Sequence, residues 1–166
     1  IRYTDHCLKA FFKTIKNESW FNETIFIITA DHSSENFTKR YQSRDGKYEV
    51  PLLVYEPGIK SMRRENSQII QHIDIIPLVL EKAGYSGTIF TLGTFFEKDG
   101  FKMAFQNEEG NCQAINSSLA YTFDGSKFIF PTKQIIENKE VLKLFEDFLK
   151  AKIQDYNYRL VNNKFY

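Results

Sequence analysis

The order of apolar and polar residues in the first half of the chain predicts an α/β core. Residues 24–32 read Thr-Ile-Phe-Ile-Ile-Thr-Ala-Asp-His, an apolar run without polar alternation. Such a β-branched and aromatic run is typical of a strand buried on both faces of a parallel sheet. Residues 50–55, Val-Pro-Leu-Leu-Val-Tyr, form a second apolar run. A helical pattern precedes the first strand, with these apolar residues on one face: Tyr3, Cys7, Leu8, Phe11, Phe12 and Ile15.

The pattern changes after Gly84. Short apolar runs, separated by turns that contain Gly at a spacing of about ten residues, predict an antiparallel meander of three or four strands over residues 88–131. Residues 134–162 carry one long helical pattern with an apolar face. We expect this helix to pack on the meander. The chain therefore divides into an α/β core over residues 1–86 and an α+β subdomain over residues 87–166.

Composition and charge exclude several classes of protein. The chain has 166 residues, of which 42% are hydrophobic, and this is enough to bury a sizeable core. A net charge of +1 argues against a nucleic-acid partner, because binding to a phosphate backbone needs a concentrated basic face. Neither a membrane segment nor a signal peptide is expected, since no run of about 20 apolar residues is present. Cys7 and Cys112 lie far apart in the sequence, which favours two free thiols over a disulfide.

Asp31 and His32 are the candidate chemical groups of the core, because they follow the first predicted strand directly. In open α/β sheets, ligands bind beyond the carboxyl ends of the strands. A carboxylate oxygen and an imidazole nitrogen together suit a divalent metal ion. The alternative is a polar turn in which Asp31 caps a helix and His32 is solvated. Further along the chain, Asp74 is expected to cap the helix that begins at Ile75.

Other motifs accompany this pair in a fixed order across roughly the first 85 residues. They are Tyr3-Thr4-Asp5, Asn22-Glu23-Thr24-Ile25-Phe26, Thr29-Ala30-Asp31-His32, Val50-Pro51-Leu52, Glu56-Pro57-Gly58 and Ile73-Asp74-Ile75-Ile76-Pro77. In this order they resemble the sulfatase-like branch of the alkaline phosphatase superfamily, and most of all its lipoteichoic-acid-synthase-like members. The resemblance implies that residues 1–86 form the C-terminal half of an alkaline-phosphatase-like parallel-sheet core. A small antiparallel sheet and a long C-terminal helix then follow it.

The resemblance also implies a function. It indicates a sulfatase-like hydrolase, or a transferase of the phosphoglycerol or phosphoethanolamine type, that acts on sulfate or phosphate esters. In this family an Asp-His pair holds a divalent cation, which polarises the ester and stabilises a Thr, Ser or formylglycine nucleophile. Asp31 and His32 match that pair, whereas nothing in the chain matches the nucleophile. The expected location is the extracytoplasmic face of the cell membrane or the periplasm.

We therefore interpret the chain as the C-terminal part of a longer enzyme, inactive without its N-terminal half. The loop between His32 and Val50 contains no further His, which two-metal relatives usually place there. The resemblance thus implies one metal site, and Mn²⁺, Mg²⁺, Ca²⁺ and Zn²⁺ all suit an Asp-His pair. The second hypothesis is a non-catalytic sulfatase-like domain that serves binding or assembly, in which both residues are merely polar.

Four more residues of this loop are candidates for supporting roles. Lys47 and Arg44 are candidate contacts to an anionic ester through charge-assisted hydrogen bonds, as is Arg40. The alternative for each is a solvated loop charge. Glu35 is a candidate for holding a metal ligand in place, or else for a capping box with a neighbouring serine.

Overall fold

The computed structural model describes residues 2–33, 38–43, 46–59, 69–93, 103–108, 111–115, 120–124, 126, 128–129 and 139–165. These residues form two compact units, Ile1–Glu65 and Asn66–Tyr166. The second helix of the chain thereby belongs to the same unit as the C-terminal sheet. The division between residues 86 and 87 stays a prediction. Within the described ranges, no helix combines the length and the apolar character that crossing a membrane requires.

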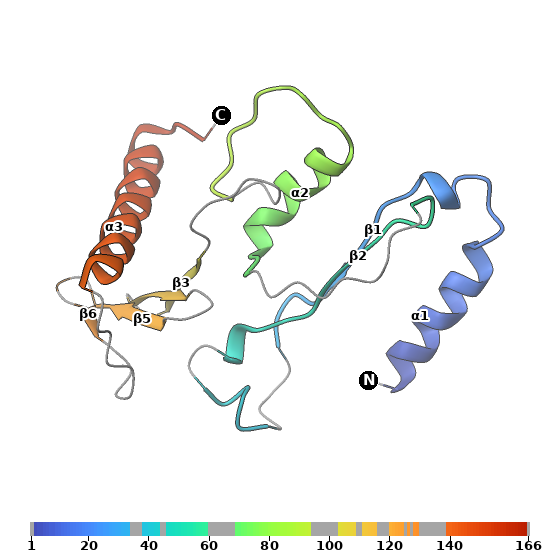
Figure 1. Cartoon of the computed structure of the whole chain (residues 1–166), viewed down its shortest axis with the longest axis horizontal. Helices are drawn as coiled ribbons and strands as arrows, with labels where there is room; N and C mark the ends of the chain where they lie inside the picture. Colours follow the sequence, from blue (N-terminus) through green and yellow to red (C-terminus); the bar gives the residue numbers. More distant parts are fainter. Residues whose placement is uncertain are drawn as a thin grey trace. The chain divides into compact units, whose positions relative to one another are not determined.

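The described residues of the first unit form one helix, two short 3-10 turns and a pair of strands (Figure 1). Its elements in chain order are α1 (Arg2–Ile15), η1 (Phe21–Glu23), β1 (Phe26–Thr29), η2 (Gly46–Tyr48) and β2 (Leu52–Tyr55). Both predicted strands are therefore present. They pair antiparallel, with Phe26 opposite Tyr55 and Thr29 opposite Leu52, whereas we expected a parallel sheet. An apolar run indicates burial, not strand direction, which depends on the partner that the strand meets.

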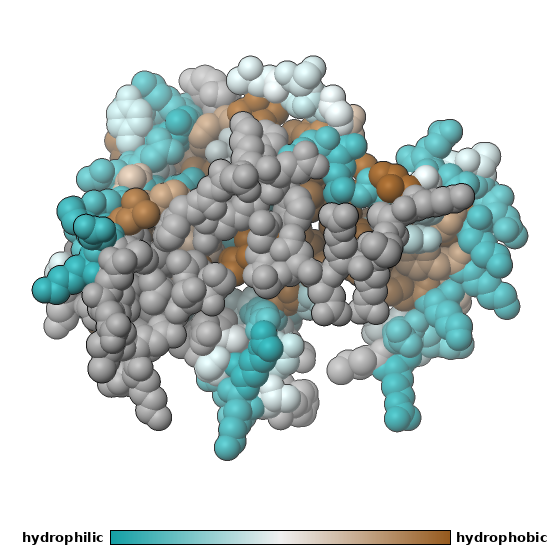
Figure 2. Space-filling view, in the orientation of Figure 1, coloured by the Kyte–Doolittle hydropathy of each residue, from teal (hydrophilic) through white to brown (hydrophobic). Residues whose placement is uncertain are grey.

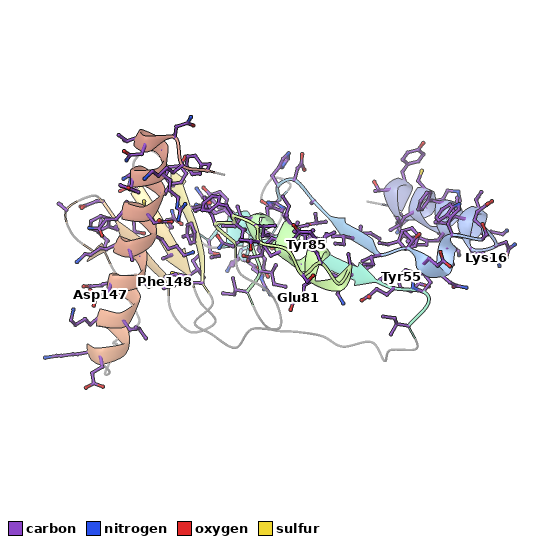
Figure 3. All side chains as sticks on the ribbon, turned by 90° about the horizontal axis from the view of Figure 1, so that it is seen from above. Lys16, Tyr55, Glu81, Tyr85, Asp147 and Phe148 are labelled. Atoms are coloured by element: carbon purple, nitrogen blue, oxygen red, sulfur yellow. The ribbon has the colours of Figure 1, made fainter. Side chains whose placement is uncertain are left out.

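Aromatic side chains join α1 to the strand pair. The ring centroid of Phe12 lies 5.0 Å from that of Phe26 and 5.7 Å from that of Tyr55, both with edge-to-face geometry. Phe21 lies 5.6 Å from Phe26. Tyr55 is labelled beside α1 in Figure 3. Part of the predicted apolar face of α1 therefore packs, and the remainder, which includes Tyr3, is exposed.

In the second unit, the part of the chain that the structure describes forms a four-stranded sheet and two helices. In chain order its elements are η3 (His72–Asp74), α2 (Ile75–Lys82), β3 (Ala104–Glu108), β4 (Asn111–Ile115), β5 (Ala120–Phe123), β6 (Phe128–Ile129) and α3 (Lys139–Asn162). The strands are ordered β3-β4-β5-β6 and each neighbouring pair is antiparallel. This confirms the predicted meander and the small antiparallel sheet followed by a long helix. The predicted start of the helix, residues 134–138, lies outside the described residues.

The meander begins later than predicted, because residues 88–93 form no strand. This segment packs on α3 instead. The guanidinium carbon of Arg159 lies 4.3 Å from the ring centroid of Phe90, and Nζ of Lys152 donates to the carbonyl of Leu92 at 3.2 Å. In this segment the carbonyl of Leu92 is therefore bonded to a side chain of α3 rather than to a neighbouring strand.

One face of α3 covers the sheet, as predicted. Leu149 is buried against Met103 and Ala114, and partly buried neighbours complete the cluster: Phe105, Phe123, Phe148 and Ile153. Figure 3 shows Phe148 on the side of α3 nearest the strands and Asp147 on the opposite side. Hydrophilic side chains line much of α1 and α3 on the face that Figure 2 shows. Both long helices are thus amphipathic, in keeping with the pattern of their sequences.

Asp74 differs from its predicted role. It lies at the N-cap position of α2, but its side chain makes no capping hydrogen bond to that helix. Its carboxylate instead accepts the backbone N–H of Gln71 at 2.8 Å and so closes the η3 turn. The preceding 3-10 turn is a nearer partner than the helix, since Asp74 is itself the last residue of that turn.

Candidate functional site

Asp31 and His32 lie two and three residues after Thr29, the last residue of β1. Their side chains point toward one another, with Nε2 of His32 3.7 Å from Oδ2 of Asp31. Both reach solvent, with exposed side-chain fractions of 88% for Asp31 and 78% for His32. The backbone N–H of His32 donates to Oδ1 of Asp31 at 2.9 Å. The carboxylate and the imidazole therefore project together into open space, and neither is sealed among apolar groups.

The other nitrogen of the His32 ring has a definite partner. Nδ1 lies 2.9 Å from the backbone carbonyl oxygen of Ser33. Because a carbonyl oxygen can only accept a hydrogen bond, Nδ1 carries the proton. The lone pair of a neutral imidazole is then on Nε2, the nitrogen that faces Asp31. The Ser33 carbonyl, and then the charge of Asp31, raise the pKa of His32 above its ordinary value.

Two hydroxyl groups tie this turn to the chain that leads into β2. Oγ1 of Thr29 donates to the carbonyl of Pro51 at 2.8 Å. Oγ of Ser33 donates to the carbonyl of Lys47, fourteen positions further along. The two ends of the intervening loop are therefore held together on either side of Asp31 and His32.

The pair fits part of the donor set of a divalent metal ion. One carboxylate oxygen and one imidazole nitrogen are accepted by Zn²⁺ and Mn²⁺, and the oxygen also by Ca²⁺ and Mg²⁺. All of these ions take four or more donors. In the described part of the chain, no three His, Cys, Asp or Glu side chains gather in one place. Asp31 and His32 thus suit a metal site that other ligands complete.

The structure places some of the other candidate residues. Lys47 lies on η2, with Nζ 4.9 Å from the ring centroid of Tyr48, and the bond from Ser33 brings its backbone to the Asp31-His32 turn. The guanidinium of Arg40 is engaged by the carboxylate of Glu49, through Nε at 2.7 Å and through Nη2. Arg44 and Glu35, the remaining candidates, lie outside the described residues.

Gly46 and Ser33 contribute to this site without having been predicted from the sequence. A Cβ atom on Gly46 would lie 2.0 Å from the carbonyl oxygen of Arg40, so the turn before Lys47 requires glycine. The adjacent Asp45-Gly46 dipeptide is a recognisable turn signal. No comparable signal marks Ser33, because its hydroxyl bonds to a residue that folding alone brings near.

Two comparisons with known proteins bear on this arrangement. The family model described as Sulfatase matches residues 1–85. Among solved structures, the chain is similar to a protein in the alkaline phosphatase superfamily from Vibrio parahaemolyticus, with 21% sequence identity and a TM-score of 0.74. That match covers 98% of this chain and 41% of the other, so this chain spans less than half of the length of that protein.

Proposed function

Because this chain belongs to the sulfatase family, we propose that Asp31 and His32 are two ligands of a divalent metal ion in an enzyme acting on sulfate or phosphate esters. The observation that supports this most directly is the convergence of Oδ2 of Asp31 and Nε2 of His32 at 3.7 Å, with both side chains exposed. The protonated Nδ1 leaves Nε2 free to bind a cation. The remaining ligands and the nucleophile are supplied by the N-terminal half of the same protein.

In this proposal each residue has a separate task. A bound divalent ion supplies a Lewis acid that polarises an ester oxygen. Asp31 contributes negative charge to the cation site and His32 a neutral nitrogen donor. Lys47 and Arg44 hold the anionic ester through charge-assisted hydrogen bonds. Glu35 keeps a ligand in position.

The reaction is hydrolysis of the ester or transfer of a phosphoglycerol or phosphoethanolamine group to an alcohol. Both outcomes use the same cation site, because they differ in the group that accepts the phosphoryl or sulfuryl unit. The proposed location is the extracytoplasmic face of the cell membrane or the periplasm. The chain of 166 residues would not turn over substrate alone, since nothing in its sequence matches the nucleophile of the family.

The test is an assay of the whole protein against aryl sulfates, aryl phosphates and phosphodiesters, with Mn²⁺, Mg²⁺, Ca²⁺ or Zn²⁺ added after treatment with a chelator. We expect turnover that requires a metal ion. Asp31→Asn and His32→Gln should each abolish it. Asp5→Asn and His6→Gln are matched controls on the exposed surface of α1 and should leave it unchanged. Unchanged turnover in Asp31→Asn would exclude Asp31 as a necessary ligand.

A non-catalytic sulfatase-like domain is the second candidate. It is favoured by the small donor set, since Asp31 and His32 are joined by no third His, Cys, Asp or Glu among the described residues. In that case the whole, folded protein would cleave none of the three ester classes with any of the four metals. The same assay therefore separates the two functions.

A further inference from the structure

Among the residues that the structure describes, the carbonyl oxygen of Ser33 is the hydrogen-bonding partner of the His32 ring. The ring is 78% exposed, so packing does not hold it, and Oδ2 of Asp31 at 3.7 Å from Nε2 is too distant for a direct hydrogen bond. The orientation and the tautomer of His32 therefore depend on the position of one backbone carbonyl. That carbonyl belongs to the residue whose hydroxyl reaches across the loop.

We infer that Ser33 is a positioning residue for the Asp31-His32 pair: its carbonyl selects the Nδ1–H tautomer of His32, and its hydroxyl anchors that carbonyl to the turn at Lys47. This inference rests on the proposed function, in which Nε2 of His32 binds a cation. If the proton moved to Nε2, that nitrogen would become a donor and could not act as a ligand. The selection of the tautomer therefore decides which ring nitrogen of His32 can bind an ion, and Nε2 is the one that lies beside Asp31.

The carbonyl of Lys47, which accepts the hydrogen bond from the Ser33 hydroxyl, lies in a turn that is fixed by other hydrogen bonds. The N–H of Lys47 donates to the carbonyl of Ser43 at 3.1 Å, and the N–H of Glu49 donates to that of Gly46 at 3.1 Å. The hydroxyl of Ser43 also accepts the N–H of Gly46 at 3.1 Å. The carbonyl of Lys47 thus sits on a turn with its own internal hydrogen bonds. A hydroxyl bonded to it holds Ser33 in place by connecting two segments fourteen residues apart.

Loss of the Ser33 hydroxyl should therefore act on His32 without touching either proposed ligand. In Ser33→Ala the carbonyl of residue 33 is no longer tied to the Lys47 turn, so the imidazole exchanges between both tautomers. Removing a group that orients a metal-binding His typically lowers metal affinity by about 10- to 100-fold. We expect the dissociation constant for Mn²⁺ to rise by about tenfold, the lower end of that range, because Ser33→Ala leaves the carbonyl present.

The experiment compares three variants of the whole protein with the wild type. Ser33→Ala removes the hydroxyl, and Ser33→Thr keeps one and should restore wild-type behaviour. Thr14→Ala is the control, because Thr14 also donates its hydroxyl to a backbone carbonyl, that of Ala10 in α1, and is part of neither the Asp31-His32 turn nor the Lys47 turn. Isothermal titration calorimetry measures the affinity for Mn²⁺. Nitrogen-15 NMR of the metal-free protein at about pH 9, above the ordinary pKa of an imidazole, identifies the tautomer of His32.

The inference is supported if the wild type and Ser33→Thr hold the Nδ1–H tautomer while Ser33→Ala loses it and binds Mn²⁺ more weakly than Thr14→Ala does. An Nε2–H tautomer in the wild type overturns it, and this result needs no variant to fold. Equal tautomer populations and equal Mn²⁺ affinity in Ser33→Ala and the wild type also overturn it. A wild type that holds the Nδ1–H tautomer but binds no Mn²⁺, Mg²⁺, Ca²⁺ or Zn²⁺ contradicts the proposed function instead, and the tautomer in Ser33→Ala then decides the role of Ser33.

Discussion

The side-chain carbonyl oxygen of Gln71 accepts a hydrogen bond of 2.8 Å from the backbone N–H of Phe105, thirty-four positions further along the chain. The amide nitrogen of the same side chain donates to the carbonyl of Met103 at 3.0 Å. Two backbone groups at the start of β3 are thus satisfied by one side chain, in the way that a neighbouring strand would satisfy them. This amide joins the segment before α2 to the C-terminal sheet and helps to explain why both belong to one compact unit.

Replacing Gln71 with Leu should destabilise the protein. The two side chains have similar volumes, but Leu leaves the N–H of Phe105 and the carbonyl of Met103 without this partner in a partly buried place. We expect the free energy of unfolding to fall by about 2 kcal/mol, as measured by urea denaturation. Gln154→Leu, at an exposed position of α3, is the control and should change it by less than about 0.5 kcal/mol. Equal losses of unfolding free energy in Gln71→Leu and Gln154→Leu would contradict the stabilising role of the Gln71 hydrogen bonds.

Replacing Lys47 with Ala tests the proposed contact to the ester. The variant removes an ammonium group but keeps the backbone carbonyl to which Ser33 donates. We expect KM for the ester to rise by about tenfold, which corresponds to the loss of one charge-assisted hydrogen bond, and affinity for Mn²⁺ to stay within about twofold. Steady-state kinetics and calorimetry measure the two quantities. Lys39→Ala, an exposed lysine of the same loop, should leave KM unchanged. An unchanged KM in Lys47→Ala would assign Lys47 to the solvated surface.

Substitution of Gly84 should destabilise the protein because of the backbone conformation at this position. Its φ is +70°, in the left-handed region, and no atom lies within 4 Å of the place of a Cβ atom. It ends α2, and the N–H of Tyr85 then returns to the carbonyl of Leu80 at 2.9 Å. Gly84→Ala should lower the free energy of unfolding by about 1 kcal/mol, through backbone strain rather than steric clash. Gly84→Asn should lose less, since Asn tolerates this conformation better. Thermal or urea unfolding that ranks Ala above Asn would contradict this reason.

The two cysteines should differ in reactivity. Both are free thiols, and Cys7 is exposed whereas Cys112 is partly buried. Burial raises the pKa of the Cys112 thiol, so a smaller fraction of it is thiolate at neutral pH. A higher pH is therefore needed to ionise Cys112 than to ionise an unburied thiol. We expect iodoacetamide to label Cys7 before Cys112 at neutral pH, as mass spectrometry of peptides would show. In Cys7→Ser, the fast phase of labelling should disappear. Faster labelling of Cys112 would show that its thiol is open to solvent.

The family was predicted from the order of several motifs rather than from any single motif. The ordered series from Tyr3 to Pro77 predicted the sulfatase-like branch, and the match over residues 1–85 confirms the family. The structural likeness to a member of the alkaline phosphatase superfamily agrees with the predicted fold. The closer resemblance to lipoteichoic-acid-synthase-like proteins stays a prediction.

Local pattern predicted the elements but not their partners. The apolar runs at residues 24–32 and 50–55 contain β1 and β2. The meander predicted over residues 88–131 corresponds to the strands β3-β4-β5-β6, the first of which begins at Ala104. The antiparallel direction of β1 and β2 was not predicted, because hydrophobicity is the same whichever way a neighbour runs. Asp74 was expected to cap α2, yet its carboxylate turns back to Gln71. A capping residue in the sequence indicates the end of a helix. It does not predict which nearby N–H group will donate a hydrogen bond to its side chain.

The sequence alone predicts Asp31 and His32 as the candidate site, because an acid and an imidazole that directly follow an apolar strand can be recognised from the order of residues. Their usable geometry depends on contacts between distant residues. The Nδ1–H tautomer of His32 follows from the carbonyl of Ser33, and the tie from Ser33 to Lys47 exists because folding brings together positions fourteen residues apart. Hydrophobic periodicity is a property of neighbouring residues and can be read in one dimension, whereas a hydrogen bond across a loop depends on where two segments come to lie in three.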